Sequence, residues 1–86
     1  MTLKHFSLLN KAKQQDIVLR NGMFLTERTD GPFKIMLYQL EDFYVEVFIF
    51  NLYDKVALFR AFDSIDELEP YFEQINVSGL LQEVLS

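Results

Sequence analysis

Four strand-like segments separated by very short turns occupy the middle of this sequence. They are MFLTERT, FKIMLYQL, FYVEVFIF and KVALFRAF, each seven or eight residues long and rich in Val, Ile, Phe and Tyr. The connections are Asp30-Gly31-Pro32, Glu41-Asp42 and Asn51 to Asp54, which contain typical turn residues. Connections of two to four residues are too short for the crossover helices that parallel strands require. The pattern therefore predicts an antiparallel meander sheet.

Helical patterns flank these segments. Residues 6–21 lack Pro and Gly and end at Asn21-Gly22, a pair suited to a left-handed C-cap. At 100° per residue, an apolar stripe falls on one side of this helix: Leu8, Leu9, Ala12, Leu19 and Met23, widened by Phe6 and Ile17, with Asp16 close to it. After the last strand, Ser64 and Glu67 fit a capping box that opens SIDELEPYFEQI, with a kink or restart expected near Pro70. Ser78 is a candidate cap for a final turn or two, GLLQEVL.

We therefore predict a single α+β domain over residues 1–86, with an N-terminal helix, a four-stranded antiparallel meander and one or two short C-terminal helices. The chain is 50% hydrophobic and 15% aromatic, which is enough for one packed core. It has no Cys and one His, so neither a disulfide nor a typical His- or Cys-based metal site is expected. His5 is interpreted as an exposed residue at the helix start.

Charge and hydropathy narrow the possible partners. The net charge of −5 argues against binding to nucleic-acid phosphates. The opening residues, MTLKHFSLLNKAKQQ, do not resemble a signal peptide, and the apolar stretch from Phe43 to Tyr53 is about half a membrane span. We expect an acidic, cytoplasmic protein without a membrane partner. The charge is uneven: residues 1–40 hold six Lys/Arg and three Asp/Glu, whereas residues 41–86 hold two and ten. This asymmetry fits solvated faces, a basic N-terminal helix that lies near the acidic C-terminal one, an acidic surface for a basic partner, or a head-to-tail self-contact.

Both faces of the predicted sheet are largely apolar. With a two-residue loop at Glu41-Asp42, one face carries Met36, Tyr38, Leu40, Val45, Val47, Ile49, Val56, Leu58 and Phe62. The other carries Phe33, Ile35, Leu37, Gln39, Tyr44, Glu46, Phe48, Phe50, Ala57, Phe59 and Ala61. An antiparallel sheet with one wet face should alternate apolar and polar residues, so something must cover the second face. Either a helical segment packs on each face, or the second face pairs with another subunit.

The leading hypothesis is a small non-enzymatic interaction protein that forms a homodimer through the aromatic-rich face, with two-fold symmetry. The alternative is a binding module for a small apolar ligand held between sheet and helix, with Glu46 or Tyr44 fixing its orientation. A third hypothesis, an enzyme subunit that uses carboxylates, has no supporting spacing. The candidate interface or ligand-binding residues are Tyr44, Glu46, Phe48, Phe50 and Phe59.

No catalytic, cofactor or metal-binding motif is predicted. The four serines lack a G-x-S-x-G context, and no Gly-rich phosphate loop is present. The carboxylates near residues 63–73 are interpreted as acidic residues at a helix start rather than as a cation site. Glu46 stands out because it interrupts an apolar strand, and a buried carboxylate must be paired or neutral. Its candidate partners are Arg28, Lys34, Arg60 and Tyr44.

Three short patterns resemble a group of small, uncharacterised bacterial proteins of similar length. The matching residues are Met23-Phe24-Leu25-Thr26-Glu27-Arg28, Phe43-Tyr44-Val45-Glu46-Val47 and Leu68-Glu69-Pro70-Tyr71. In that group, a helix is followed by an F-L-x-E-R strand, a Y-V-E-[VL] strand and a closing L-x-P-Y helix. The resemblance spans about residues 7–75 and implies a bacterial cytoplasmic α+β protein, with no catalytic residue carried over.

Overall fold

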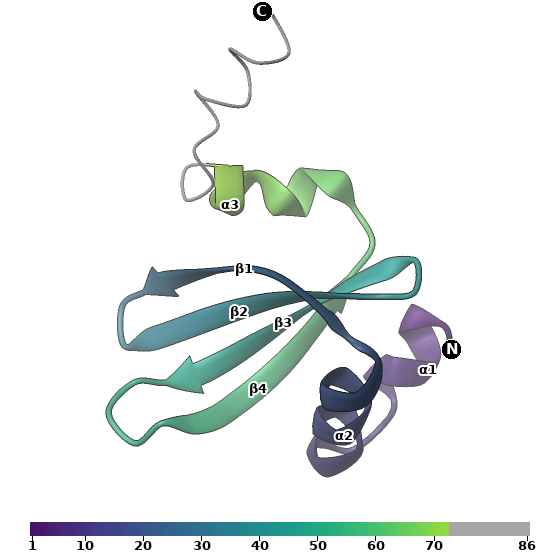
Figure 1. The fold of residues 1–86 in the computed structure, drawn as a ribbon, viewed down its shortest axis with the longest axis horizontal. Coiled ribbons are helices and arrows are strands. Elements are labelled where there is room, and N and C mark those ends of the chain that lie inside the picture. The colour runs from purple at the N-terminus through teal and green to yellow at the C-terminus, as the bar shows by residue number, and fades with distance from the viewer. Residues whose placement is uncertain (73–86) are drawn as a thin grey trace, which may run out of the picture.

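Short turns join four strands into one antiparallel sheet. The computed structural model of the chain describes residues 1–72. Its strands are β1 (Met23–Asp30), β2 (Phe33–Leu40), β3 (Phe43–Phe50) and β4 (Lys55–Phe62), adjacent in the order β1-β2-β3-β4 (Figure 1). Each turn contains one residue with positive φ, namely Gly31 at 58°, Glu41 at 58° and Asp54 at 55°. Positive φ matches the turn to the twist of the strands that it joins. The predicted antiparallel meander and α+β class are confirmed.

The N-terminal helix is broken in two. In place of one helix over residues 6–21, the chain forms α1 (Leu3–Ser7) and α2 (Lys11–Asn21). The side chain of Asn10 accepts a hydrogen bond from the Lys13 backbone N–H at 2.9 Å, so Asn10 acts as the N-cap of α2. The sequence pattern missed this cap, because Leu, Lys, Gln and Ala on both sides of Asn10 favour a continuous helix.

The break changes which residues face the sheet. Phe6 and Val18 are buried, whereas Leu8 and Leu19 are 77% and 70% exposed. The centre of the predicted apolar stripe, through Leu8, Leu9, Ala12, Leu19 and Met23, is therefore wrong, since it assumed one continuous helical phase. Phe6 and Ile17, predicted at its margins, do pack against the core. The predicted left-handed cap is also wrong. Gly22 is extended, with φ −77° and ψ 144°, and a Cβ atom there would lie 2.6 Å from the Val18 carbonyl oxygen.

Helical segments lie on opposite faces of the sheet (Figure 1). On one side, termed the helix face, α1 and α2 place Phe6 and Val18 against a buried cluster from the strands: Leu40, Phe43, Val45 and Val47. On the other side, termed the groove face, lie the 3-10 helix η1 (Ile65–Leu68) and α3 (Glu69–Phe72). There Tyr71 packs with Leu37 and Phe62. The helix face is thus covered by two helices, and the groove face by a single short segment in the described chain.

The C-terminal segment begins differently from the prediction. The Ser64 side chain makes no capping hydrogen bond, and the Glu67 side chain accepts from Arg60 instead, so the predicted capping box is wrong. The restart near Pro70 is confirmed, because η1 ends at Leu68 and α3 begins at Glu69. Ser78 and the GLLQEVL turn lie outside the described residues.

A β-bulge moves part of β4 to the opposite face. Ile49 pairs with Val56 but Phe48 pairs with Leu58, so Ala57 is the extra residue. Every residue after Ala57 is therefore displaced by one position in the alternation. Leu58 and Phe62, predicted on the helix face, lie on the groove face. Phe59 and Ala61, predicted on the groove face, pack against the helix-face core.

The cap between α1 and α2 generates a stability prediction. Asn10→Ala should lower the free energy of unfolding by about 1 kcal/mol, because it leaves a helix-terminal N–H without its acceptor. Gln15→Ala, an exposed change on the same helix, should change stability by less than about 0.5 kcal/mol. Urea denaturation measures both. Equal stability of the two variants would show that Asn10 does not hold the start of α2.

Candidate functional site

A buried carboxylate lies at the centre of the groove face. Glu46 is 2% exposed and sits on β3, where it pairs directly with Arg60 of β4 and with Leu37 of β2. Its Oε1 accepts from Arg60 at 2.6 Å, and its Oε2 accepts from Arg28 at 3.3 Å and from the Tyr71 hydroxyl. Each carboxylate oxygen therefore has at least one donor, which offsets the cost of removing the charge from water.

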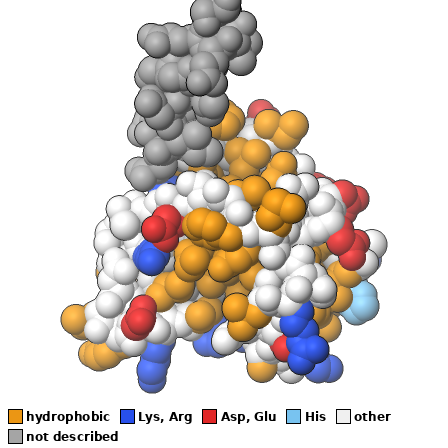
Figure 2. Space-filling view, in the orientation of Figure 1, with side chains coloured by type: hydrophobic (Ala, Val, Ile, Leu, Met, Phe, Trp, Pro, Cys, Tyr) orange, Lys and Arg blue, Asp and Glu red, His pale blue; other side chains and the backbone are white. Residues whose placement is uncertain are grey.

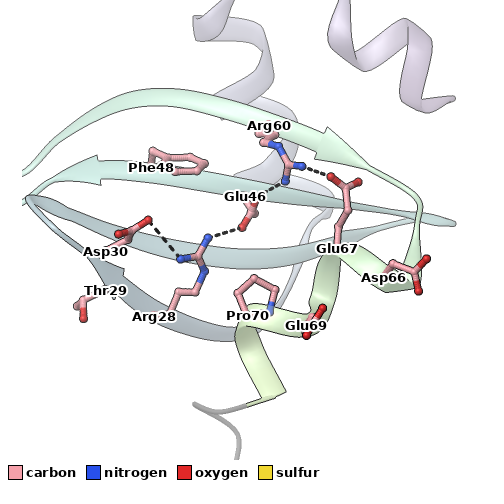
Figure 3. Close-up of a pocket in the computed structure, with 10 residues that line it drawn as sticks. All are labelled: Arg28, Thr29, Asp30, Glu46, Phe48, Arg60, Asp66, Glu67, Glu69 and Pro70. Atoms are coloured by element: carbon pink, nitrogen blue, oxygen red, sulfur yellow. Dashed lines mark hydrogen bonds and ion pairs between the residues drawn. The ribbon is translucent and has the colours of Figure 1, made fainter.

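The donors converge on Glu46 from three different elements. Figure 3 shows Arg28 and Arg60 pointing toward Glu46 from β1 and β4, on either side of β3. Arg60 also pairs with Glu67 of η1, and the Arg28 guanidinium lies 5.1 Å from the centre of the Tyr71 ring, a cation–π distance. This network ties η1 and α3 to the sheet.

The sequence identified two of the donors. Arg28 and Arg60 were among the four candidates and do bind Glu46. Lys34 instead pairs with Glu27, and Tyr44 stacks on Phe62 at 5.6 Å. Tyr71 was missed as a donor, because its position depends on how the chain reverses after β4. The one sequence signal for this role was a hydroxyl-bearing aromatic residue among the acidic and apolar residues of the C-terminal helical segment.

The network shifts the protonation equilibria of its members. Burial raises the pKa of the Tyr71 hydroxyl above its ordinary value, and its hydrogen bond to the Glu46 carboxylate raises it further. Burial acts to lower the pKa of Arg28 and of Arg60. At Arg28, hydrogen bonds and charge from Tyr71 and Glu46 outweigh burial. At Arg60, hydrogen bonds and charge from Glu46 and Glu67 do the same, so both pKa values are raised. The two arginines and Tyr71 thus remain protonated around neutral pH.

A groove of about 800 Å³ runs between the sheet and η1–α3 (Figure 3). It is lined by Arg28, Thr29, Asp30, Glu46, Phe48, Arg60, Asp66, Glu67, Glu69 and Pro70. Five of these residues are acidic and two are basic, and both arginines already bind Glu46. Asp30 lies 3.7 Å from Arg28 but is 71% exposed, and Asp66 and Glu69 have no ion-pair partner within residues 1–72. The surplus charge of the groove is therefore negative.

An aromatic surface continues from the groove toward the β3–β4 turn. This surface, termed the aromatic patch, consists of Phe33, Phe48, Phe50, Tyr53 and Leu58. Ring centres are 6.0 Å apart for Phe33–Phe48, 5.7 Å for Phe33–Phe50 and 5.7 Å for Phe50–Tyr53. The three phenylalanines are half-buried, whereas Tyr53 and Leu58 are exposed. Tyr71 of α3 packs on Leu37 and Phe62, and both of these residues lie outside the patch.

Four of the five candidate residues lie on the groove face. Phe48 and Phe50 belong to the aromatic patch, Glu46 lies beneath the groove, and Tyr44 stacks on Phe62 beside η1–α3. Phe59 does not join them, since the bulge at Ala57 turns it toward the helix-face core. Leu58 was missed for the same reason. Within residues 1–72, no group of three His, Asp or Glu side chains could hold a metal ion, and no helix could cross a membrane.

Removing the charge of Glu46 tests the network. Glu46→Gln should lower the free energy of unfolding by roughly 3 kcal/mol, because it leaves two arginine side chains without their buried counter-ion. Glu41→Gln is the matched control, since Glu41 pairs with the N-terminus at an exposed site and should change stability by less than about 1 kcal/mol. Chemical denaturation measures both. Similar losses for the two variants would mean that the central carboxylate does not hold the network.

The raised pKa of Tyr71 gives a pH dependence of known sign. Above pH 10.0 the unfolded chain loses the Tyr71 proton while the folded chain retains it, so stability decreases as pH rises. The loss should approach about 1.4 kcal/mol per pH unit, and it is absent in Tyr71→Phe. The stability advantage of the wild type over Tyr71→Phe should therefore be constant below about pH 9 and shrink toward pH 11. A stability difference between the wild type and Tyr71→Phe that stays constant to pH 11 would show that the pKa of the Tyr71 hydroxyl is not raised.

Comparison with known proteins identified no relative of this chain. No protein-family model matches the chain, and neither the curated proteins nor the solved structures gave a match. The resemblance to small bacterial proteins stays a prediction.

Proposed function

We propose that this chain is a small non-enzymatic interaction protein that associates with itself through the aromatic patch. The observation that carries the proposal is the patch itself, in which three half-buried phenylalanines continue into the exposed side chains of Tyr53 and Leu58. Contiguous apolar surface of this kind marks interaction sites in soluble proteins. Aromatic side chains also dominate the energetics of many interfaces.

Burial of the patch favours association, because apolar surface removed from water contributes about 25 cal/mol per Å². Part of this gain is offset by the lost freedom of two molecules that become one. The rings already contact one another within each copy, so little side-chain entropy remains to be lost on binding. A partly ordered aromatic patch is therefore a good anchor.

The bonding of Glu46 supports a non-enzymatic role for this buried carboxylate. General acid–base catalysis needs a carboxyl group free to exchange a proton with a substrate. Both oxygens of Glu46 instead accept hydrogen bonds from side chains of the same fold. His5 is exposed on α1, and α1 packs on the opposite face of the sheet from Glu46.

A small ligand is the second candidate, favoured by the groove between the sheet and η1–α3. The charged lining fits a polar ligand better than the apolar one predicted from the sequence. Tyr44 is absent from that lining, because it stacks on Phe62. A mass retained through native mass spectrometry would favour this candidate over self-association.

Leu58→Glu tests the aromatic patch. Leu58 is 46% exposed and pairs with Phe48, so a carboxylate there leaves the fold intact but opposes burial of the patch. The apparent dissociation constant of the oligomer should rise at least about tenfold, a cost of roughly 1.4 kcal/mol or more. Native mass spectrometry and light scattering over a range of concentrations measure it.

Leu25→Glu is the matched control for this test. Leu25 is 41% exposed and lies on β1, at the other edge of the sheet, where the pairing with β2 shifts register. It should leave the dissociation constant unchanged within about twofold. If Leu58→Glu associates as tightly as the wild type does, the aromatic patch is not the contact surface.

A further inference from the structure

The two helical layers of this protein carry opposite charge. Residues 3–21, termed the basic layer, contain Lys4, Lys11, Lys13 and Arg20 but only one acidic residue. Residues 65–72, termed the acidic layer, contain Asp66, Glu67 and Glu69 and no Lys or Arg. Since α1–α2 and η1–α3 lie on opposite faces of the sheet, each copy has a basic side and an acidic side (Figure 1).

Much of this charge is not neutralised within the fold. In the basic layer Arg20 pairs with Asp16 at 2.8 Å, but Lys4 and Lys13 have no carboxylate partner within residues 1–72. Figure 2 shows Lys and Arg side chains gathered over the part of the molecule where α2 lies. In the acidic layer Glu67 pairs with Arg60, whereas Asp66 and Glu69 do not pair within the same residues. Net charge on each side is therefore available to a partner.

The apolar surfaces follow the same division. The basic layer exposes Leu8 and Leu19, which the break at Asn10 turns away from the sheet. The groove face exposes Leu58 and Tyr53 of the aromatic patch, beside a groove with surplus negative charge. The groove face thus combines exposed apolar side chains with surplus negative charge. The basic layer combines exposed apolar side chains with Lys4 and Lys13, although Lys4 also lines a hollow with Glu41, Asp42 and Asp63.

We infer that the basic layer of one copy packs against the groove and aromatic patch of the next copy, in a head-to-tail contact. The inference rests on the proposed self-association and names the surface that meets the patch. Charge decides between this contact and the two-fold dimer expected from the sequence. Placing two groove faces together brings the Asp30, Asp66 and Glu69 side chains of both copies near one another, and like charges at an interface are costly.

The head-to-tail contact instead brings Lys4 and Lys13 of one copy to the acidic groove of another. Opposite charges then meet around the apolar contact, which favours both encounter and orientation. Because the two contact surfaces lie on opposite faces of the sheet, each head-to-tail pair still has one free surface of each kind. Further copies therefore add until the assembly closes into a ring or grows into a chain, and a two-fold dimer is excluded.

Reciprocal charge reversal tests the inference. One variant carries Lys4→Glu with Lys13→Glu, and the other carries Asp66→Lys with Glu69→Lys. All four positions lie outside the Glu46 network, so both variants should melt close to the wild type. Each alone should associate at least about tenfold more weakly than the wild type. An equimolar mixture should recover the wild-type assembly, because every contact then joins opposite charges again.

Leu25→Lys is the charge control, since it adds positive charge at an exposed position of β1, away from both surfaces, and should leave association unchanged. Association of the wild type should also weaken as salt concentration increases. Native mass spectrometry and light scattering give the size and the stoichiometry of the mixture. If the variant with Asp66→Lys and Glu69→Lys melts well below the wild type, Glu69→Lys alone replaces it in the test.

The outcomes separate the two proposals. If Lys4→Glu with Lys13→Glu associates as the wild type does while Leu58→Glu does not, the head-to-tail contact is wrong and the aromatic patch pairs with another surface. If Leu58→Glu associates normally, self-association through the patch fails, and the head-to-tail contact fails with it. A wild type that is monomeric at every concentration also overturns both.

Discussion

The buried Glu46 carboxylate is the constraint on which the groove face depends. A charge at 2% exposure in the centre of a sheet is unfavourable unless donors surround it. Arg28, Arg60 and Tyr71 meet that requirement from three elements, and Glu67 engages the second arginine. The segment from η1 to α3 is therefore held over one part of the face by a geometrically specific set of bonds. An apolar contact alone would allow it to slide.

That attachment decides which apolar surface stays open. Tyr71 can reach Glu46 only if α3 lies over Leu37 and Phe62, and within residues 1–72 this position leaves Tyr53 and Leu58 of the aromatic patch exposed. The patch and the network are thus two consequences of one polar residue in an otherwise apolar strand. A leucine at position 46 would remove the need for the two arginines and for the Tyr71 hydroxyl, and with them the bonds that hold α3 over Leu37 and Phe62.

The sequence predicted the topology well because it depends on local signals. Turn residues at Gly31, Glu41 and Asp54 and strands of similar length leave one arrangement for the sheet. Features that depend on one residue were harder to predict. Asn10 interrupts a helix whose composition favours continuity, and the bulge at Ala57 reverses the alternation in β4 with no Gly or Pro to mark it. These two residues account for the errors at Leu8, Leu19, Leu58 and Phe59.

Both errors bear on the interaction surfaces. The cap at Asn10 turns Leu8 and Leu19 outward beside the lysines of α1 and α2, and the bulge at Ala57 adds Leu58 to the aromatic patch while removing Phe59. The local irregularities thus place exposed apolar side chains on both faces of one sheet. In the head-to-tail contact that we propose, these two surfaces of different copies meet, and a contact between two different surfaces favours repetition over pairing.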